Sequence, residues 1–318
     1  MQADASGIRR QRTFRLQGLG PLIGLVLIVI VLSVSAENFL TVNNLLNVLR
    51  QVSINALIAF GMTFVILTGG IDLSVGSILA LSSALTAGLM VGGTDTWIAV
   101  IAGLGAGTLM GVLNGVLVAK GRLAPFIVTL ATMTVFRGLT LVYTEGKPIT
   151  GLNDDFGFLG KGYFLQIPMP VIWMVISFAV LYIILKHTTF GRRVYAVGSN
   201  EEATWLSGIS TSKVKIMVYS ISGLLAAVSG IILTSRLNSA QPTAGGAYEL
   251  DAIAAVVLGG TSLAGGRGWI VGTLIGAVII GVLDNGLNLL NVSSFYQQVV
   301  KGAVILVAVL FDRAKNKK

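Results

Sequence analysis

The 318-residue sequence contains no cysteine and only one histidine, His187. The lack of cysteine excludes disulfide bonds, thiol catalysis and cysteine-ligated zinc or iron–sulfur centres. A single histidine argues against a histidine-based metal site as well, and His187 lies beside the expected end of an apolar segment, where an imidazole ring can cap backbone carbonyl groups. We therefore expect no metal ion, no cofactor and no catalytic residue in this chain.

Charged side chains are also scarce. They make up 11% of the chain, against about 25% in soluble domains, whereas hydrophobic residues make up 54% and the mean hydropathy is +0.86. This composition excludes an ordinary water-soluble globule. The 40 glycines are typical of membrane bundles, in which small residues let helices approach one another closely.

A nucleotide-hydrolysing motif is missing too. A P-loop requires the pattern G-x-x-x-x-G-K-[ST], whose backbone amides and lysine hold phosphates. The two Gly-Lys pairs of this chain, at 146–147 and 160–161, are followed by Pro148 and Gly162 instead. The sequence therefore predicts a chain that does not hydrolyse ATP by itself.

Ten apolar stretches follow one another along the chain, and each is a candidate membrane-spanning or re-entrant helix. They cover residues 19–34, 52–67, 75–92, 97–118, 124–143, 169–185, 214–234, 251–263, 269–290 and 297–311. A full crossing takes about 20 residues, so the stretch at 251–263 is expected to be a half-helix or a re-entrant element. We predict an all-α, polytopic membrane bundle of about ten helices, with eight or nine full crossings as the alternative.

The distribution of lysine and arginine predicts that both termini are cytoplasmic. An even number of helices returns the chain to its starting side, and 16 of the 22 basic residues then lie on the cytoplasmic side, as the positive-inside rule requires. These 16 are Arg9, Arg10, Arg12, Arg15, Lys120, Arg122, Lys186, Arg192, Arg193, Lys213, Lys215, Arg267, Arg313, Lys315, Lys317 and Lys318. A cleavable signal peptide is the competing interpretation of the N-terminus, but no cleavage site followed by a polar domain is present.

This topology divides the chain into three parts. We expect a basic cytoplasmic arm at residues 1–18, a transmembrane domain at 19–311 and a basic cytoplasmic tail at 312–318. Within the transmembrane domain, the turn-rich connection at 144–168 is expected to be a periplasmic loop or a short surface helix. The connection at 186–213 is expected to face the cytoplasm.

The cytoplasmic connection contains the signals of a short, doubly capped helix. Ser199 or Asn200 can cap its start, Glu201 and Glu202 match the helix dipole in the first turn, and Gly208 can end it. Its apolar side chains would form a docking surface for a partner protein. A helix lying on the lipid surface is the alternative, which the two glutamates disfavour because they would face anionic headgroups.

Glycine-rich breaks interrupt the apolar stretches at two places. The string LTGGIDLSVG at residues 67–76 is echoed, with a one-residue gap, by LGGTSLAGG at 258–266. Repeated halves that place broken helices near a central pathway are common in transporters, although two glycine pairs can also recur by chance in so glycine-rich a chain.

Few charged side chains lie inside the expected spans, whereas ion-coupled carriers usually keep such groups in mid-membrane. Asp72 is favoured as an N-cap of a helix that starts near Ser74 over an ion-binding role. Arg137 and Lys301 lie well inside expected spans, where pairing or snorkelling is favoured over substrate contact.

Small neutral polar side chains are more frequent in the spans. They include Ser53, Asn55, Thr63, Ser82, Ser83, Thr86, Asn114, Thr129, Ser220, Ser222, Asn285 and Asn288. Such groups suit weak binding of an uncharged polyol. For any one of them, a hydrogen bond between helices is the simpler explanation.

Long strings of this sequence resemble the membrane-spanning permeases of sugar ABC importers, and the resemblance covers nearly the whole chain. It is carried by NFLTVNNL at residues 38–45, NALIAFGMT at 55–63, LTGGIDLSVGS at 67–77, AQPTAG at 240–245, YELDAIAAVVLGGTSLAGG at 248–266 and NGLNLL at 285–290.

The resemblance implies a homodimeric permease in the bacterial inner membrane, which translocates ribose or a similar neutral monosaccharide. Its partners would be a cytoplasmic ABC ATPase subunit, a periplasmic sugar-binding protein, a second copy of itself and membrane lipid, and not nucleic acid. The implied contact residues for the ATPase are Arg192, Arg193, Glu201, Glu202, Ala203 and Gly208. We expect its motion to gate the pathway at the glycine breaks. The expected gate or pathway residues are Asn55, Gly69, Gly70, Asp72, Ser74, Asp251, Gly259, Gly260, Asn285 and Asn288.

Three residues depart from the family pattern. The coupling motif of the family is Glu-Ala-Ala with a glycine four residues later, and here Thr204 replaces the second alanine. Trp205 stands where relatives often have arginine, and Asp284 where they often have asparagine. A stand-alone sugar facilitator or ion-coupled carrier is the alternative function, and a membrane scaffold without transport is the third.

Overall fold

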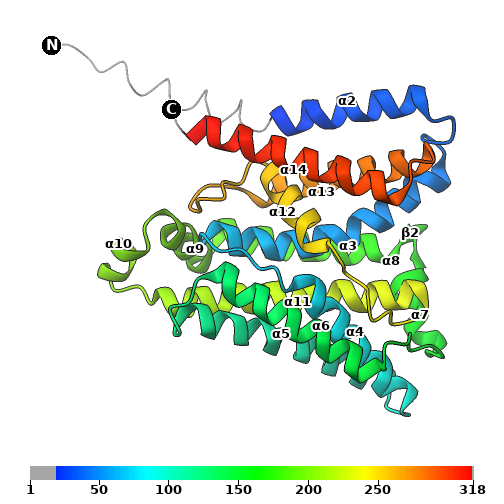
Figure 1. Ribbon diagram of the computed structural model, residues 1–318, viewed down its shortest axis with the longest axis horizontal. Coiled ribbons are helices and arrows are strands. Elements are labelled where there is room, and N and C mark those ends of the chain that lie inside the picture. Colours follow the sequence, from blue (N-terminus) through cyan, green and yellow to red (C-terminus); the bar gives the residue numbers. More distant parts are fainter. Residues whose placement is uncertain (1–18, 317–318) are drawn as a thin grey trace.

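The computed structural model describes residues 19–316, which form thirteen α-helices and one small β-hairpin (Figure 1). The helices are α2 (Leu19–Ser35), α3 (Val42–Leu67), α4 (Val75–Val91), α5 (Thr96–Ala119), α6 (Pro125–Thr144), α7 (Asp154–Lys161), α8 (Met169–His187), α9 (Thr189–Ser199), α10 (Glu201–Leu206), α11 (Thr211–Leu237), α12 (Tyr248–Leu258), α13 (Ile270–Leu289) and α14 (Ser294–Asn316). The strands β1 (Tyr163–Phe164) and β2 (Ile167–Pro168) pair antiparallel between α7 and α8. The basic arm predicted at 1–18 and the last two residues of the predicted tail lie outside the described residues.

Each of the ten predicted apolar stretches coincides with a helix, so the prediction of an all-α, polytopic bundle is confirmed. Within residues 19–316, six helices are long and apolar enough to cross a membrane, namely α3, α5, α6, α8, α11 and α13. The helices α2 and α4 are apolar but shorter, and α12 has only 11 residues because it ends before the Gly259-Gly260 pair. The prediction that the 251–263 stretch is too short for a full crossing is therefore confirmed.

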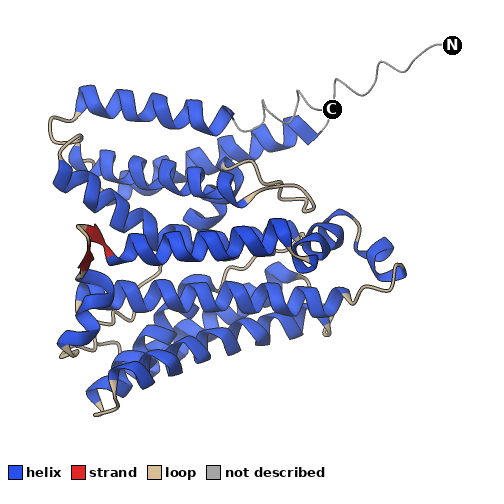
Figure 2. Ribbon diagram, turned by 180° about the vertical axis from the view of Figure 1, so that it is seen from behind, coloured by secondary structure: helices blue, strands red, loops and turns tan. Residues whose placement is uncertain are grey.

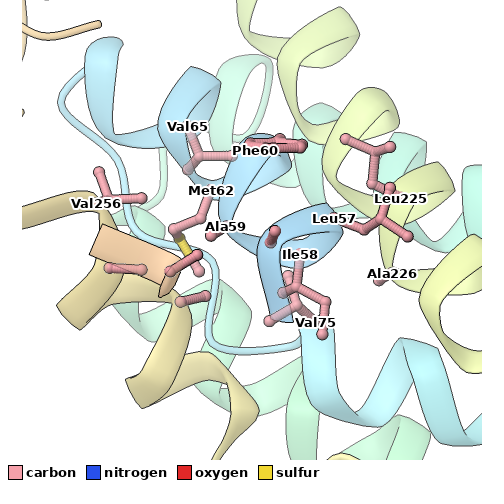
Figure 3. Packing of buried hydrophobic residues seen from close by; sticks show 14 of the residues in the cluster. Leu57, Ile58, Ala59, Phe60, Met62, Val65, Val75, Leu225, Ala226 and Val256 are labelled. Atoms are coloured by element: carbon pink, nitrogen blue, oxygen red, sulfur yellow. The ribbon is translucent and has the colours of Figure 1, made fainter. Parts of the chain in front are cut away.

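Helix α3 lies at the centre of the bundle. It begins at Val42, well before the apolar stretch, because Thr41 caps it by accepting a hydrogen bond from the backbone amide of Asn44. From Val52 to Leu67 every residue is buried. Figure 3 shows its side chains between Leu225 and Ala226 of α11 on one side and Val256 of α12 on the other. A helix that is apolar all round must be enclosed by others.

The outer helices differ from α3 because their apolar side chains remain uncovered. On α6, Ile127 is 61% and Val142 77% exposed, and α5 and α8 carry similar residues. Such large apolar surfaces are typical of helices that face lipid. The core of this fold therefore lies around α3, and the outer surface of the bundle is apolar enough to face the lipid of a membrane.

Glycine lets α5 and α11 cross closely. A Cβ atom on Gly107 of α5 would lie 2.9 Å from the carbonyl oxygen of Gly223 on α11, and a Cβ atom on Gly223 would clash with the Gly107 carbonyl. Because helices in lipid associate through close packing rather than hydrophobic burial, small residues at this crossing stabilise the bundle.

The two ends of the bundle carry different surface elements. The helices α9 and α10, the turn between α5 and α6, the start of α2 and the last described residues of α14 lie at one end (Figure 1). The hairpin and α7 lie at the other end, as the view from behind also shows (Figure 2). The connection at 144–168 thus contains the predicted surface helix, and the hairpin in it was not predicted.

Both short helices, α4 and α12, follow a long helix through a coil that returns into the bundle. Residues 68–74 connect α3 to α4, and residues 238–247 connect α11 to α12. The 238–247 coil approaches the start of α4, where Gly245 packs against Gly76. Interrupted helices of this kind are typical of transporters.

Candidate functional site

Helix α10 has the capping predicted from the sequence. Asn200 is its N-cap and accepts a hydrogen bond from the Ala203 amide at 2.9 Å, and Glu201 and Glu202 occupy the first turn. Gly208 follows with φ +81°, a conformation that favours glycine. The short, doubly capped helix is therefore confirmed as a structure.

Helix α10 exposes apolar side chains. Trp205 and Leu206 are 63% and 71% exposed, and Ala203 and Gly208 are exposed as well. Thr204, the departure from the family pattern, is buried and donates its hydroxyl to the Asn200 carbonyl at 2.7 Å. The replacement of alanine by Thr204 therefore leaves the outward surface of α10 unaltered.

A cavity of about 570 Å³ lies between α10 and the turn that joins α5 to α6. Arg122 and Leu123 of the turn line it opposite Glu202 and Trp205. At its edge Lys215 of α11 forms an ion pair with Glu201, with 2.6 Å between Nζ and Oε2. Sequence reasoning counted Arg122 only as a cytoplasmic charge, because no local pattern connects residues 122 and 205.

The predicted contact residues Arg192 and Arg193 lie on α9, a helix that was not predicted. Thr188 caps this helix by accepting a hydrogen bond from the Gly191 amide at 3.2 Å. Both arginines are exposed, on the same end of the molecule as α10. The structure thus places five of the six predicted contact residues on two adjoining helices, and the sixth, Gly208, directly after α10.

Helix α9 contacts both glycine breaks. Gly198, in its last turn, packs so closely on the carbonyl of Leu67 that a Cβ atom would overlap it. The same carbonyl accepts a hydrogen bond from the Gly266 amide at 2.9 Å. The hydroxyl of Tyr195 donates to the Gly268 carbonyl at 2.8 Å. The end of α3, the 259–268 segment and α9 therefore form one packed unit.

The Tyr195 contact does not depend on pH near neutrality. Burial raises the pKa of the Tyr195 phenol above its ordinary value of about 10. The hydroxyl therefore keeps its proton and remains a hydrogen-bond donor at physiological pH.

The two breaks begin with the same backbone geometry. Gly69 and Gly260 are left-handed, with φ +78° and +86°. The residue after each glycine donates a backbone hydrogen bond to the carbonyl five residues earlier. The Gly70 amide donates to Val65 at 3.1 Å, and the Thr261 amide donates to Val256 at 3.2 Å. These are Schellman ends. In this geometry Gly69 corresponds to Gly260. The sequence alignment of the two glycine pairs instead matches Gly69 with Gly259, one residue earlier, and Gly259 is the C-cap of α12.

Asp72 is fully buried in the first break, but it is not the N-cap of α4. The N-cap is Ser74, because α4 begins at Val75. The Asp72 carboxylate instead accepts hydrogen bonds from the Ser74 amide at 3.1 Å, the Ser74 hydroxyl at 2.6 Å and the Ser222 hydroxyl at 2.9 Å. Asn114 donates to the Ser74 hydroxyl at 2.7 Å. The expected cap is thus corrected to a network that joins the break to α5 and α11.

Lys301 forms ion pairs with two buried acids. Its Nζ lies 3.0 Å from Oδ2 of Asp251 and 2.9 Å from Oδ2 of Asp284, so it connects α12, α13 and α14. Arg137 donates to the carbonyl oxygens of Pro242 and Ala244 at 2.8 Å. The prediction that Lys301 is paired is confirmed, and Arg137 binds backbone carbonyls.

The asparagines predicted for the pathway lie in different surroundings. Asn285 and Asn44 exchange two amide hydrogen bonds, of 2.8 and 2.9 Å, between α13 and α3. Asn288 is exposed and accepts a hydrogen bond from Gln297 at 2.8 Å. Asn55 is buried within α3. The structure does not gather these three side chains at one place.

Within residues 19–316 no group of three acidic, histidine or cysteine side chains could hold a metal ion. A multi-pass helical bundle with interrupted helices and a capped, exposed surface helix is typical of membrane transport permeases. The sequence model of the family described as "Branched-chain amino acid transport system / permease component" matches residues 44–309. This chain belongs to that family.

Comparison with characterised proteins identifies relatives of nearly equal length. The chain is 65% identical to the ribose import permease protein RbsC of Bacillus subtilis (strain 168) over 303 residues, 95% of this chain and 94% of that protein. It is 56% identical to the ribose import permease protein RbsC of Escherichia coli (strain K12) over 299 residues, 93% of each. The D-allose transport system permease protein AlsC of the same strain is 42% identical, covering 92% of this chain and 90% of its own length. Comparison with solved structures gave no match.

Proposed function

We propose that this chain is the membrane-spanning permease subunit of an ABC importer, and that it translocates ribose or a similar neutral monosaccharide across the bacterial inner membrane. The observation that carries this proposal is the identity of 65% and 56% with two ribose import permeases over nearly the full length of each chain. The chain has no P-loop, so a separate ATPase subunit supplies the energy and a binding protein supplies the sugar. A neutral sugar gains nothing from the membrane potential, and its accumulation needs such a partner.

Helix α10 is the contact for the ATPase in this proposal. Its exposed Trp205 and Leu206 offer an apolar surface, and the exposed Arg192 and Arg193 add positive charge on the neighbouring α9. Helix α9 ends at Ser199, directly before Asn200, the N-cap of α10. A displacement of α10 by the ATPase would therefore move the last turn of α9, where Gly198 packs on Leu67. The break residues would then gate the pathway. The close contacts of α9 with both breaks support this sequence of events.

The same proposal assigns the two ends of the bundle to the two sides of the membrane. The end with α10 is cytoplasmic and carries both termini, and the end with α7 and the hairpin is periplasmic. The ten apolar helices return the chain to its starting side if the short α12 completes one crossing together with the 238–247 coil that leads into the bundle. The exposed apolar surfaces of α5, α6 and α8 would face lipid or a second copy of the chain in a homodimer.

Two substitutions test the coupling role of α10. Glu202→Lys reverses a charge in its first turn, and Gly208→Val places a β-branched residue at φ +81°. Both are expected to prevent sugar uptake by the complete complex and to reduce co-purification of the ATPase subunit. Glu145→Lys changes an exposed acid at the opposite end and leaves co-purification unchanged. Normal uptake by both α10 variants in an assembled complex would refute the coupling role.

A stand-alone facilitator or an ion-coupled carrier is the competing function. Proteoliposomes that contain only this chain distinguish the two, because an importer subunit moves no sugar against a gradient without its ATPase and binding protein. Saturable uptake by the chain alone would favour the competing function. Growth of a deletion strain on a panel of monosaccharides identifies the substrate, and unchanged growth on all of them would indicate a scaffold.

A further inference from the structure

A second cavity, of about 440 Å³, lies at the end of the bundle that carries the hairpin. It is open on one side and is lined by α3, the end of α11, the 238–247 coil and the start of α12. Its polar lining consists of Gln51, Arg236, Gln241, Thr243 and Tyr248. None of these five residues was assigned a role in the pathway from the sequence. The volume is within the roughly 300–1,000 Å³ usual for sites of small molecules.

The polar side chains of this cavity have unused hydrogen-bonding capacity. Those of Gln51, Arg236 and Tyr248 make no hydrogen bond or ion pair with any residue that the structure describes, although all three are half-buried. Gln241 donates one hydrogen bond, to the Ser239 hydroxyl at 3.0 Å. A half-buried guanidinium without a counter-charge is costly in a membrane protein unless water or a ligand solvates it. The cavity is therefore polar and solvated.

Most polar groups elsewhere in the bundle are already satisfied. Thr63, Ser83 and Thr86 each donate to the carbonyl four residues earlier in the same helix. Asp72 is held by its hydrogen bonds to Ser74 and Ser222, and Asn285 by its two hydrogen bonds with Asn44. These residues stabilise the bundle, and their hydrogen bonds would have to break before they could bind a substrate. The cavity residues need no such rearrangement.

The lining suits a neutral sugar. Carboxamides and a hydroxyl can both donate to and accept from sugar hydroxyls, a guanidinium offers five N–H donors, and a tyrosine ring can cover the apolar face of the sugar. The cavity wall also contains Gly245, which packs against Gly76 at the start of α4. A molecule in the cavity thus lies next to the first glycine break.

We propose that this cavity receives the monosaccharide on the periplasmic side before the break opens. Gln51, Arg236 and Gln241 hydrogen-bond its hydroxyls, and Tyr248 lies against its ring. The proposal rests on the proposed function, since it assumes that the chain translocates a neutral sugar. It differs from the gate and pathway expected from the sequence, because none of the expected residues lines this cavity; they are Asn55, Gly69, Gly70, Asp72, Ser74, Asp251, Gly259, Gly260, Asn285 and Asn288.

Transport by the complete complex tests the proposal. Gln51→Leu and Gln241→Leu each remove hydrogen-bonding groups from the cavity without touching α9 or α10. Each is expected to lower sugar uptake roughly fivefold, as for the loss of one or two hydrogen bonds, while ATP hydrolysis stimulated by the binding protein stays unchanged. Gln298→Leu is the matched control, because Gln298 is exposed on α14, and its uptake remains normal. Unchanged uptake by both cavity variants would overturn the proposal.

Thiol labelling gives a direct readout, since the native chain has no cysteine. In Thr243→Cys, sugar-loaded binding protein is expected to slow labelling of this chain in the complete complex, and unloaded binding protein is not. Gln298→Cys should react equally under both conditions. Equal labelling of Thr243→Cys with loaded and unloaded binding protein would contradict the proposal. Failure of the proposed function is distinguishable, because the unaltered complex would then import no ribose at all.

Discussion

Lys301 illustrates how a single residue can make charge tolerable inside this bundle. It lies between Asp251 and Asp284, which are 6% and 4% exposed, and its Nζ is within 3.0 Å of both carboxylates. Removal of one partner from a buried ion pair costs more than the pair contributes, because the remaining charge is left uncompensated. Lys301 therefore affects stability chiefly because its loss would leave the buried carboxylates of Asp251 and Asp284 without a counter-charge.

Lys301→Met is predicted to destabilise the protein by about 3–5 kcal/mol, since two buried carboxylates would lose their counter-charge. The Tm of the detergent-purified complex measures the effect. The triple variant Lys301→Met, Asp251→Asn, Asp284→Asn removes all three charges and should regain most of the lost stability. A single variant with an unchanged Tm would show that the ion pairs do not stabilise the bundle.

Gly198 is the residue on which contact between α9 and the breaks depends. Gly198→Ala is predicted to reduce uptake at least tenfold, because a Cβ atom would overlap the Leu67 carbonyl and force α9 away from the break. Gly138→Ala on α6 is the control, since a Cβ atom there meets nothing within 4 Å. Uptake assays on both variants, with complex assembly verified, decide the matter. Normal uptake by Gly198→Ala would show that α9 tolerates displacement.

At the scale of elements, α10 is notable for having six residues and little contact with the core. Its geometry comes from its own caps, Asn200 and Gly208, and from the Lys215 ion pair with Glu201. This construction leaves Trp205 and Leu206 uncovered in the isolated chain. Exposed aromatic side chains of this kind often dominate the binding energy of an interface.

Trp205→Ala is predicted to weaken binding of the ATPase subunit by about 2 kcal/mol, or roughly 30-fold in Kd. Titration of the purified ATPase against the permease in nanodiscs measures this change. Trp97→Ala is the matched control, because Trp97 is 55% exposed at the start of α5. Equal Kd values for Trp205→Ala and the unaltered protein would exclude Trp205 from the interface.

At the scale of the whole molecule, the two ends of the bundle must face opposite sides of the membrane. Cysteine introduced by Ser207→Cys, next to α10, is predicted to react with a membrane-impermeant thiol reagent only after cells are permeabilised. Cysteine from Asp155→Cys, on the exposed side of α7, is predicted to react in intact cells. The reverse pattern would invert the topology. The native chain contributes no background, because it has no cysteine.

Local signals in the sequence were sufficient to predict much of this protein. The ten helices follow from apolar stretches, and the caps of α10 follow from residue types within a span of nine positions. Both predictions succeeded because hydrophobicity and capping act over short distances along the chain. Other local features were missed, such as the hairpin, whose turn uses Leu165 and Gln166 at positive φ instead of Asn-Gly.

Only the tertiary structure decided which polar side chains form hydrogen bonds or ion pairs within the bundle and which do not. Asp72 meets Ser222, Asn44 meets Asn285 and Lys301 meets Asp251 across many turns of chain. The same folding brings Gln51 and Tyr248 to one cavity and leaves their hydrogen bonds unmade. Composition and hydropathy determined that the chain is a helical membrane bundle, because lipid selects for apolar helices whatever their neighbours. The position of each polar side chain depends on helices distant in sequence, and therefore only their packing could reveal it.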